Sequence, residues 1–183
     1  MNYGALHPES QAFLSSWQAL SDLGSHHGGD SVLTRDASTI IDRIFLAQRV
    51  GEGVFTFKTI GTELKFWTGR DLRDHEVCSL FHGPDQALVR ALLESAMSAP
   101  GPALARAIAF GAGVGQRAEI ELAFLPLIEK GVGDRVLGLF QPLSMDNKIS
   151  KPVLRIALTS LSPPAPNMPI RQGLRLVRNE SEC

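Results

Sequence analysis

Residues 117–142 read RAEIELAFLPLIEKGVGDRVLGLFQP, two apolar stretches of strand length on either side of a short turn that contains glycine. In the first stretch, Ile120 and Phe124 belong to an apolar row that alternates with polar or small residues. This two-residue period is typical of a strand with one face toward a core. The sequence therefore predicts an antiparallel hairpin of two strands, 117–128 and 135–142.

Three more strands are predicted upstream. Residues 44–50 and 54–60 are rich in β-branched and aromatic side chains and are separated by Gly-Glu-Gly, which is a hairpin signal. Residues 104–112 alternate large side chains, among them Ile108, with a row of alanines. A helical insert lies between the first hairpin and these later strands. This order of elements predicts an α+β fold on a mostly antiparallel sheet.

Two helices complete the expected architecture. Residues 9–23 carry apolar side chains every three or four positions, which predicts an amphipathic helix. Residues 84–98 begin at a proline, and Arg90 and Glu94 are spaced to form an ion pair about one helical turn apart. Between 61 and 82 the sequence predicts short helical turns.

Composition restricts the class of protein. The chain has 183 residues, 44% of them hydrophobic, and a formal net charge of −1. Near-neutral charge argues against a dedicated nucleic-acid binder, and no apolar run approaches the ~20 residues of a membrane span. The N-terminus lacks the features of a signal peptide, and Cys78 and Cys183 form no disulfide or metal pattern. We therefore expect a cytoplasmic protein without membrane contact.

The chain is expected to divide into three parts. Residues 1–31 form an N-terminal helix and linker, residues 32–146 the main domain, and residues 147–183 a partly irregular C-terminal extension. Within the extension, residues 153–161 fit either one further strand or a short helix. A basic extension is compatible with nucleic acid, an anionic membrane or an acidic partner, although a solvated end is the simpler interpretation. Its basic residues are Lys151, Arg155, Arg171, Arg175 and Arg178.

Two motifs point to a known family. The first is GTELKFWTGRDL at residues 61–72, in which Gly61 permits a turn into a small helix and Gly69 permits that helix to end. The second is ELAFLPL at 121–127, followed by DRVLGL at 134–139. With these motifs in this order of elements, residues 32–144 resemble a PAS domain. Within that superfamily the chain is similar to the small PAS proteins common in alphaproteobacteria.

The resemblance implies a five-stranded antiparallel sheet with helices on one face, preceded by the N-terminal amphipathic helix. PAS domains bind small molecules, haem or flavin, or associate with signalling partners, and a flanking helix often makes a dimer interface. No kinase, cyclase, phosphodiesterase or DNA-binding module is recognised beside this domain. The expected function is therefore that of a non-catalytic bacterial sensor in signal transduction, acting through homodimerisation and contact with a partner signalling protein. A DNA-associated regulator that uses the basic tail is an alternative.

Neither flavin nor haem is expected as a cofactor. Cys78 lies where light-oxygen-voltage sensors keep their flavin-reactive cysteine, but the late strands offer apolar residues where flavin-reading Asn or Gln would stand. A buried free cysteine is usually a small hydrophobe. Haem needs an axial ligand such as histidine, and His75 and His82 only precede the long helix. An unidentified small apolar ligand stays an open alternative.

A small α+β enzyme is the remaining alternative. The sequence has no nucleophile elbow, phosphate loop or His-Glu-x-x-His motif. Asp74 and His75 would be able to transfer protons if they lined a cleft, but an exposed turn is the simpler interpretation. Glu119 and Glu121 share one strand face and fit a solvated surface at least as well as an acid and base pair. We therefore expect no catalytic residue and no metal site.

Two sets of site residues follow from these patterns. Between the sheet face and the helical insert we expect either plain core packing or a ligand cleft, lined by Phe57, Leu64, Trp67, Leu80, Leu92, Ile108, Phe124 and Phe140. The candidate dimer interface is the apolar stripe of the N-terminal helix, formed by Phe13, Leu14, Trp17 and Leu20.

Overall fold

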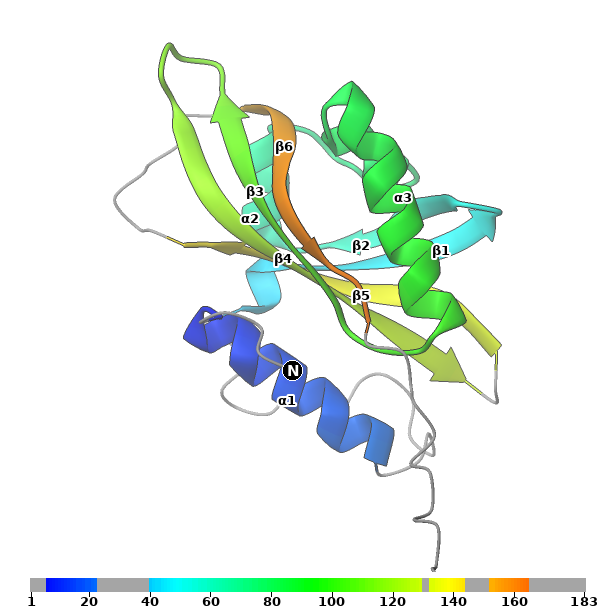
Figure 1. Cartoon of the computed structure of the whole chain (residues 1–183). Helices are drawn as coiled ribbons and strands as arrows, with labels where there is room; N and C mark the ends of the chain where they lie inside the picture. The colour runs from blue at the N-terminus through cyan, green and yellow to red at the C-terminus, as the bar shows by residue number, and fades with distance from the viewer. Residues whose placement is uncertain (1–5, 23–39, 130–131, 144–151, 165–183) are drawn as a thin grey trace, which may run out of the picture.

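The computed structural model describes residues 6–22, 40–129, 132–143 and 152–164. One antiparallel sheet forms the centre of the molecule, with helices on both of its faces (Figure 1). In chain order the elements are α1 (Pro8–Asp22), η3 (Ile41–Arg43), β1 (Ile44–Gly51), β2 (Val54–Ile60), α2 (Thr62–Thr68), η4 (Val77–Leu80), α3 (Gly83–Ser98), β3 (Ala103–Gly111), β4 (Arg117–Glu129), β5 (Val132–Pro142) and β6 (Val153–Ser162).

The sheet has six strands in the order β2-β1-β5-β4-β3-β6. The sequence predicts five of them, and residues 153–161 adopt the strand rather than the helix left open for them. Strand β6 pairs with β3 and so covers an edge that a five-stranded sheet would expose. Its own outer edge is partly paired, because the His82 N–H donates to the Ile156 carbonyl (2.8 Å) and the Leu158 N–H donates to Asp85 (2.9 Å).

The main core lies on the face of the sheet toward α2, η4 and α3. Phe45, Phe57, Phe124 and Phe140 are at most 2% exposed. The Phe45 ring touches the other three rings at centroid separations of 5.1, 6.2 and 6.3 Å. Ring contacts of this kind each add about 0.5–1.5 kcal/mol to the stabilisation from burial. Phe57, Phe124 and Phe140, which were expected to lie between the sheet and the helical insert, therefore do share one interior.

Helix α1 covers the opposite face of the sheet. Phe13 and Leu14 of α1 pack with Leu104, Leu125 and Leu139 in a second apolar cluster. Figure 1 shows α1 and α3 on opposite sides of the strands. The helices of the insert lie on one face, as expected, and α1 adds a layer on the other. The sheet is therefore buried on both faces over much of its area.

The insert between β2 and α3 depends on the two glycines of the motif at 61–72. Gly69 ends α2 in the left-handed conformation (φ 67°), which L side chains rarely adopt. Gly61 is needed for a different reason from the sharp turn predicted for it. Its φ is −62°, and an added Cβ would collide with the backbone carbonyl of Asp42. Close approach of two backbones therefore selects glycine at this position.

Arg90 and Glu94 of α3 hold the β1–β2 turn, a different use from the ion pair along the helix that the sequence predicts. The Arg90 Nε donates to the Gly53 carbonyl (2.9 Å), and Glu94 accepts from the Gly53 N–H (2.6 Å). Arg90 also pairs with Glu76 (2.8 Å), and Glu94 pairs with Arg49 (2.9 Å). Both side chains contact residues that lie far away in the sequence, and these contacts hold α3 against the β1–β2 hairpin.

The core on β5 is shaped by the absence of a side chain at Gly138. This residue pairs with Phe45 of β1 on one side and with Phe124 of β4 on the other. An added Cβ at Gly138 would collide with the Phe45 ring. Glycine therefore lets the ring lie across β5 and reach Phe124.

The substitution Gly138→Ala should lower the free energy of unfolding by about 1–3 kcal/mol, because a fully buried ring must move. Urea unfolding measures this change. The matched control is Gly83→Ala, where an added Cβ meets no atom within 4 Å. That variant should stay within about 0.5 kcal/mol of the wild type. Equal stability of the two variants would contradict the role given to Gly138.

Candidate functional site

The residues predicted to line a cleft lie together, apart from one. Phe57, Leu64 and Phe124 are at most 1% exposed within the main core. Trp67 packs against this core and is partly buried. The remaining members are Leu80, Leu92 and Phe140. Their mutual contacts are those of a packed interior, the simpler of the two expectations for these residues.

Ile108 is the exception. Ala103, Ala105, Ala107 and Ala109 of β3 belong to the main core. Side chains alternate along a strand, so Ile108 points to the other face of the sheet. The prediction is wrong at this residue because β3 has apolar side chains on both faces, and the larger ones were assigned to the core. The alanines instead face the insert, where small side chains allow close packing.

Asp74 and His75, which were weighed for proton transfer, lie on an exposed turn. The Asp74 side chain is 78% exposed, and its backbone has a φ of 64°. The Asp74 N–H donates to the Phe57 carbonyl (2.8 Å), and the Phe57 N–H donates to the His75 carbonyl (3.0 Å). Both His75 and His82 are exposed. Among the described residues, no group of three or more His, Cys, Asp or Glu side chains is arranged to hold a metal ion.

Cys78 lies in η4 and is fully buried in the main core. Burial raises the pKa of its thiol to about 11. The reactive form of cysteine is the thiolate, so the side chain at neutral pH is a protonated, apolar group. The structure places it as a small hydrophobe among core residues.

A row of polar side chains that the sequence interpretation missed crosses the sheet beneath α1. Arg106, Glu121 and Gln141 are cross-strand neighbours on β3, β4 and β5. Arg43, just before β1, donates to Gln141 and to Glu9 of α1 (2.7 Å). We call these five residues the α1 polar row. No short-range pattern reveals it, since Arg43 is 34 residues from Glu9 and 98 from Gln141.

Glu121 is only 1% exposed, although a solvated face was the simpler expectation for it. Its carboxylate accepts a hydrogen bond from the His7 backbone N–H (3.2 Å) and pairs with Arg106 (3.4 Å). A buried carboxylate is costly without such partners. The alternation along β4 is predicted correctly, but the carboxylate is met by His7, which directly precedes α1 and lies 114 residues away in sequence.

Arg43 also pairs with Glu63 of α2 (3.3 Å), so one guanidinium serves two carboxylates. Their pKa values move in opposite directions. The hydrogen bond from Arg43 lowers the pKa of Glu9. Partial burial raises the pKa of Glu63 and outweighs the attraction of Arg43. The contact of Arg43 with Glu9 is also the shorter of the two (2.7 Å), and it joins α1 to the sheet.

Three of the four predicted dimer residues pack against the sheet of their own chain. Phe13 is 2% exposed and Leu14 is 8% exposed. The Trp17 indole N–H donates to the Pro126 carbonyl (2.9 Å). Pro126 lies beyond the last residue pair between β3 and β4, where its missing N–H is not needed. In the structure this stripe is thus used within one chain.

Some predicted features lie outside the described residues. They are the side chain of Leu20, the linker at 23–31, and the tail residues Lys151, Arg171, Arg175 and Arg178. Arg155, the other basic residue of the extension, is described and lies on β6.

No helix in the described part of the chain is long and apolar enough to span a membrane.

Comparison with known proteins identifies the family. A family model described as a PAS domain matches residues 5–141, well over half of the chain. The chain belongs to the PAS domain family. The matched range of this PAS domain includes α1 and the strands β1 to β5, and it ends before β6. As a PAS domain, the chain is a sensory or signalling module.

Fifteen chains of solved structures also match this PAS domain. One of them is described as the structure of an RNA-binding light-oxygen-voltage receptor. It is 16% identical, with a TM-score of 0.42, and the match covers 60% of this chain and 32% of the receptor chain. This chain thus spans about a third of that receptor's length. Among curated proteins, none matches this chain.

The substitution Arg43→Met should detach α1 from the sheet. It leaves Glu9 and Gln141 without their guanidinium partner, and loss of one member of a buried charged contact costs about 2–4 kcal/mol. Hydrogen exchange should therefore become faster along α1, and urea unfolding should show the loss of stability.

The control for this prediction is Arg73→Met. Arg73 pairs with Asp71 at the surface (2.6 Å), where an ion pair contributes little. Exchange along α1 should be unchanged in this variant. If Arg43→Met also left exchange along α1 unchanged, the α1 polar row would have no part in docking the helix.

Proposed function

We propose that this PAS domain is a non-catalytic sensor that transmits changes of its interior to the α1 side of the sheet, where a second copy or a partner signalling protein is engaged. We also propose that it acts in the cytoplasm and needs no haem or flavin. The proposal is supported by how the sheet is shared between the two apolar clusters.

Neighbouring residues of three strands touch different clusters. Phe45, Phe124 and Phe140 belong to the main core, and the residue next to each one in sequence belongs to the α1 cluster. Those neighbours are Ile44, Leu125 and Leu139. A single layer of backbone therefore separates the interior from α1. A displacement of a core ring moves a strand that α1 also contacts, and close packing transmits such movements. This observation carries the proposal.

The catalytic alternative has less support. Asp74 and His75 are exposed and bound through their backbones to β2. Neither residue is paired with a hydroxyl or thiol nucleophile in the structure's described part, and Cys78 carries a thiol whose pKa is raised by burial. Contact with another protein is thus the better-supported way for this domain to act.

A core variant tests the transmission. The substitution Phe124→Leu removes ring contacts from β4 and should speed hydrogen exchange along α1 by about fivefold, a change in free energy of ~1 kcal/mol. The control is Val77→Ala in η4, which also opens the main core but lies outside β1, β4 and β5. Exchange along α1 is compared between the two variants under conditions in which each has lost the same free energy of unfolding. Equal effects on α1 would refute transmission through the strands.

The homodimer is proposed to form by exchange of α1 between two copies. Phe13, Leu14 and Trp17 already pack within one chain, so a dimer through these residues needs α1 of each copy to cover the sheet of the other. Exchange of an identical element costs few contacts. Residues 23–39 connect α1 to the sheet. A segment of that length, at ~3.3 Å per extended residue, is long enough to reach a neighbouring copy.

Light scattering of the full chain tests the dimer. The wild type should have twice the 19.8 kDa mass of one chain, and Trp17→Glu should halve the mass, because a charge then replaces the ring that docks on Pro126. Gln18→Glu is the matched control, since it adds the same charge at an exposed position of α1. A monomeric wild type, or a Trp17→Glu dimer, would overturn the exchange of α1.

A further inference from the structure

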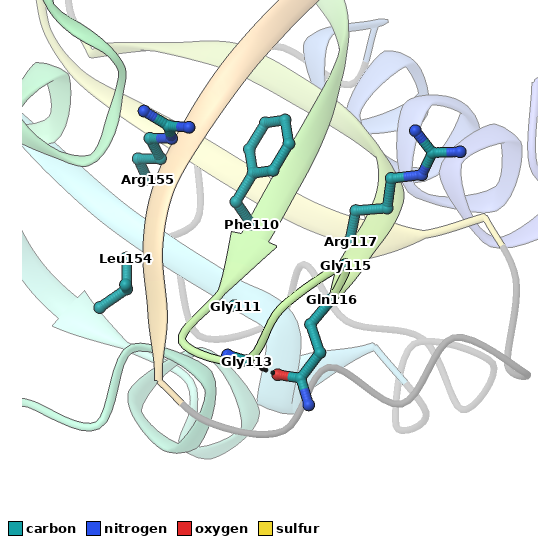
Figure 2. Close-up of a pocket in the computed structure, with 8 residues that line it drawn as sticks. All are labelled: Phe110, Gly111, Gly113, Gly115, Gln116, Arg117, Leu154 and Arg155. Carbon is teal, nitrogen blue, oxygen red and sulfur yellow. Dashed lines mark hydrogen bonds between the residues drawn. The ribbon is translucent and has the colours of Figure 1, made fainter.

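A hollow of about 700 Å³ lies at the β3–β4 turn, away from both apolar clusters (Figure 2). Its lining combines side chains of β3, β4, β6 and the turn with three glycines at the end of β3 and in the turn. We call it the β3–β4 hollow. Its volume falls in the range of sites for small molecules. The side chains that line it are Phe110, Gln116, Arg117, Leu154 and Arg155.

Two arginines flank an aromatic ring in this hollow. Arg117 of β4 and Arg155 of β6 are the cross-strand neighbours of Phe110 on its two sides. Cross-strand partners share a face, and Figure 2 shows the ring between the two arginine side chains. The Arg155 guanidinium lies 5.1 Å from the centroid of the ring. That contact orients the guanidinium and leaves its hydrogen-bond donors available.

Neither arginine is paired with a carboxylate in the part of the chain that the structure describes. Both are exposed, and no acidic side chain contributes to the lining of the hollow. Other arginines differ, since Arg43, Arg49 and Arg90 each form an ion pair with a glutamate. The β3–β4 hollow therefore presents two unmatched positive charges beside an apolar ring.

We propose that the β3–β4 hollow binds a small phosphate-bearing ligand of nucleotide size, held by Arg117 and Arg155 on either side of Phe110. A phosphate monoester carries about two negative charges at neutral pH, which match the two guanidinium groups, whereas a carboxylate carries one. The fork of donors on arginine fits phosphate oxygens in pairs. Phe110 offers an apolar face to the rest of the ligand.

The site goes beyond the proposed sensor function and lies outside the interior of the domain. Its backbone frame spans about 10 Å from Arg117 across Phe110 to Arg155, two strand spacings. The Arg117 side chain runs away from the ring in Figure 2, so binding of one phosphate by both guanidinium groups requires Arg117 to turn toward Phe110. Strand β6 supplies Arg155 and lies beyond the range that matches the family. The complete site thus depends on a strand outside the range that matches the family model.

Binding to the full chain is measured by calorimetry with inorganic phosphate and adenosine monophosphate as probes. Both should bind, the nucleotide more tightly, and Arg117→Ala and Arg155→Ala should each weaken nucleotide binding about tenfold. Lys58→Ala is the control. It removes the same charge at the opposite edge of the sheet, on β2, and should leave binding unchanged. Circular dichroism shows whether each variant is folded.

Three outcomes would overturn the proposal. The first is that neither probe binds to the wild type. The second is that Lys58→Ala weakens binding as much as the two arginine variants, which would indicate a general effect of charge. The third distinguishes the source of the phosphate. A short oligothymidylate that binds far more tightly than the nucleotide, with an affinity that falls steeply in salt, would identify a nucleic-acid backbone in place of a small ligand.

Discussion

The contact between the Phe45 ring and the backbone of Gly138 determines how the two faces of this sheet are used. Because Gly138 has no side chain, the ring of Phe45 extends over β5 and meets Phe124 on β4. The main core is thereby drawn together across three adjacent strands. The same strands turn their next residues toward α1, so the rings and the helix pack against opposite sides of one layer of backbone.

Two kinds of contact hold α1 to the sheet. The apolar cluster around Phe13 and Leu14 buries the inner face of α1, and hydrophobic burial has no directional preference. The α1 polar row adds direction, since Arg43 reaches Glu9 and Gln141 only when the start of α1 lies over the end of β5. Buried charged groups tolerate few alternative arrangements because each lost partner is costly. The polar row therefore fixes where the helix lies on the sheet.

Strand β6 lies outside the range that matches the family model and covers the β3 edge of the sheet. It pairs along β3, and its outer edge meets His82 and Asp85 at the start of α3. Arg155 on this strand stands beside Phe110, whose other cross-strand neighbour is Arg117, so strands β1 to β5 alone do not contain this pair of charges. Sensing in the interior and ligand binding at the edge would thus use different residues of one sheet.

The sequence by itself determined the elements, because periodicity, glycines and prolines act within a few residues. It gave strands 117–128 and 135–142, the helix that Pro84 begins, and the rings of Phe57, Phe124 and Phe140 as interior. It failed where both faces of a strand are apolar, as at Ile108, and where a distant segment buries a charge, as at Glu121. Only the tertiary structure decided that α1 packs on its own sheet and that Arg43 links it there. Those contacts join residues far apart in the chain, and no local pattern encodes which distant partners will meet.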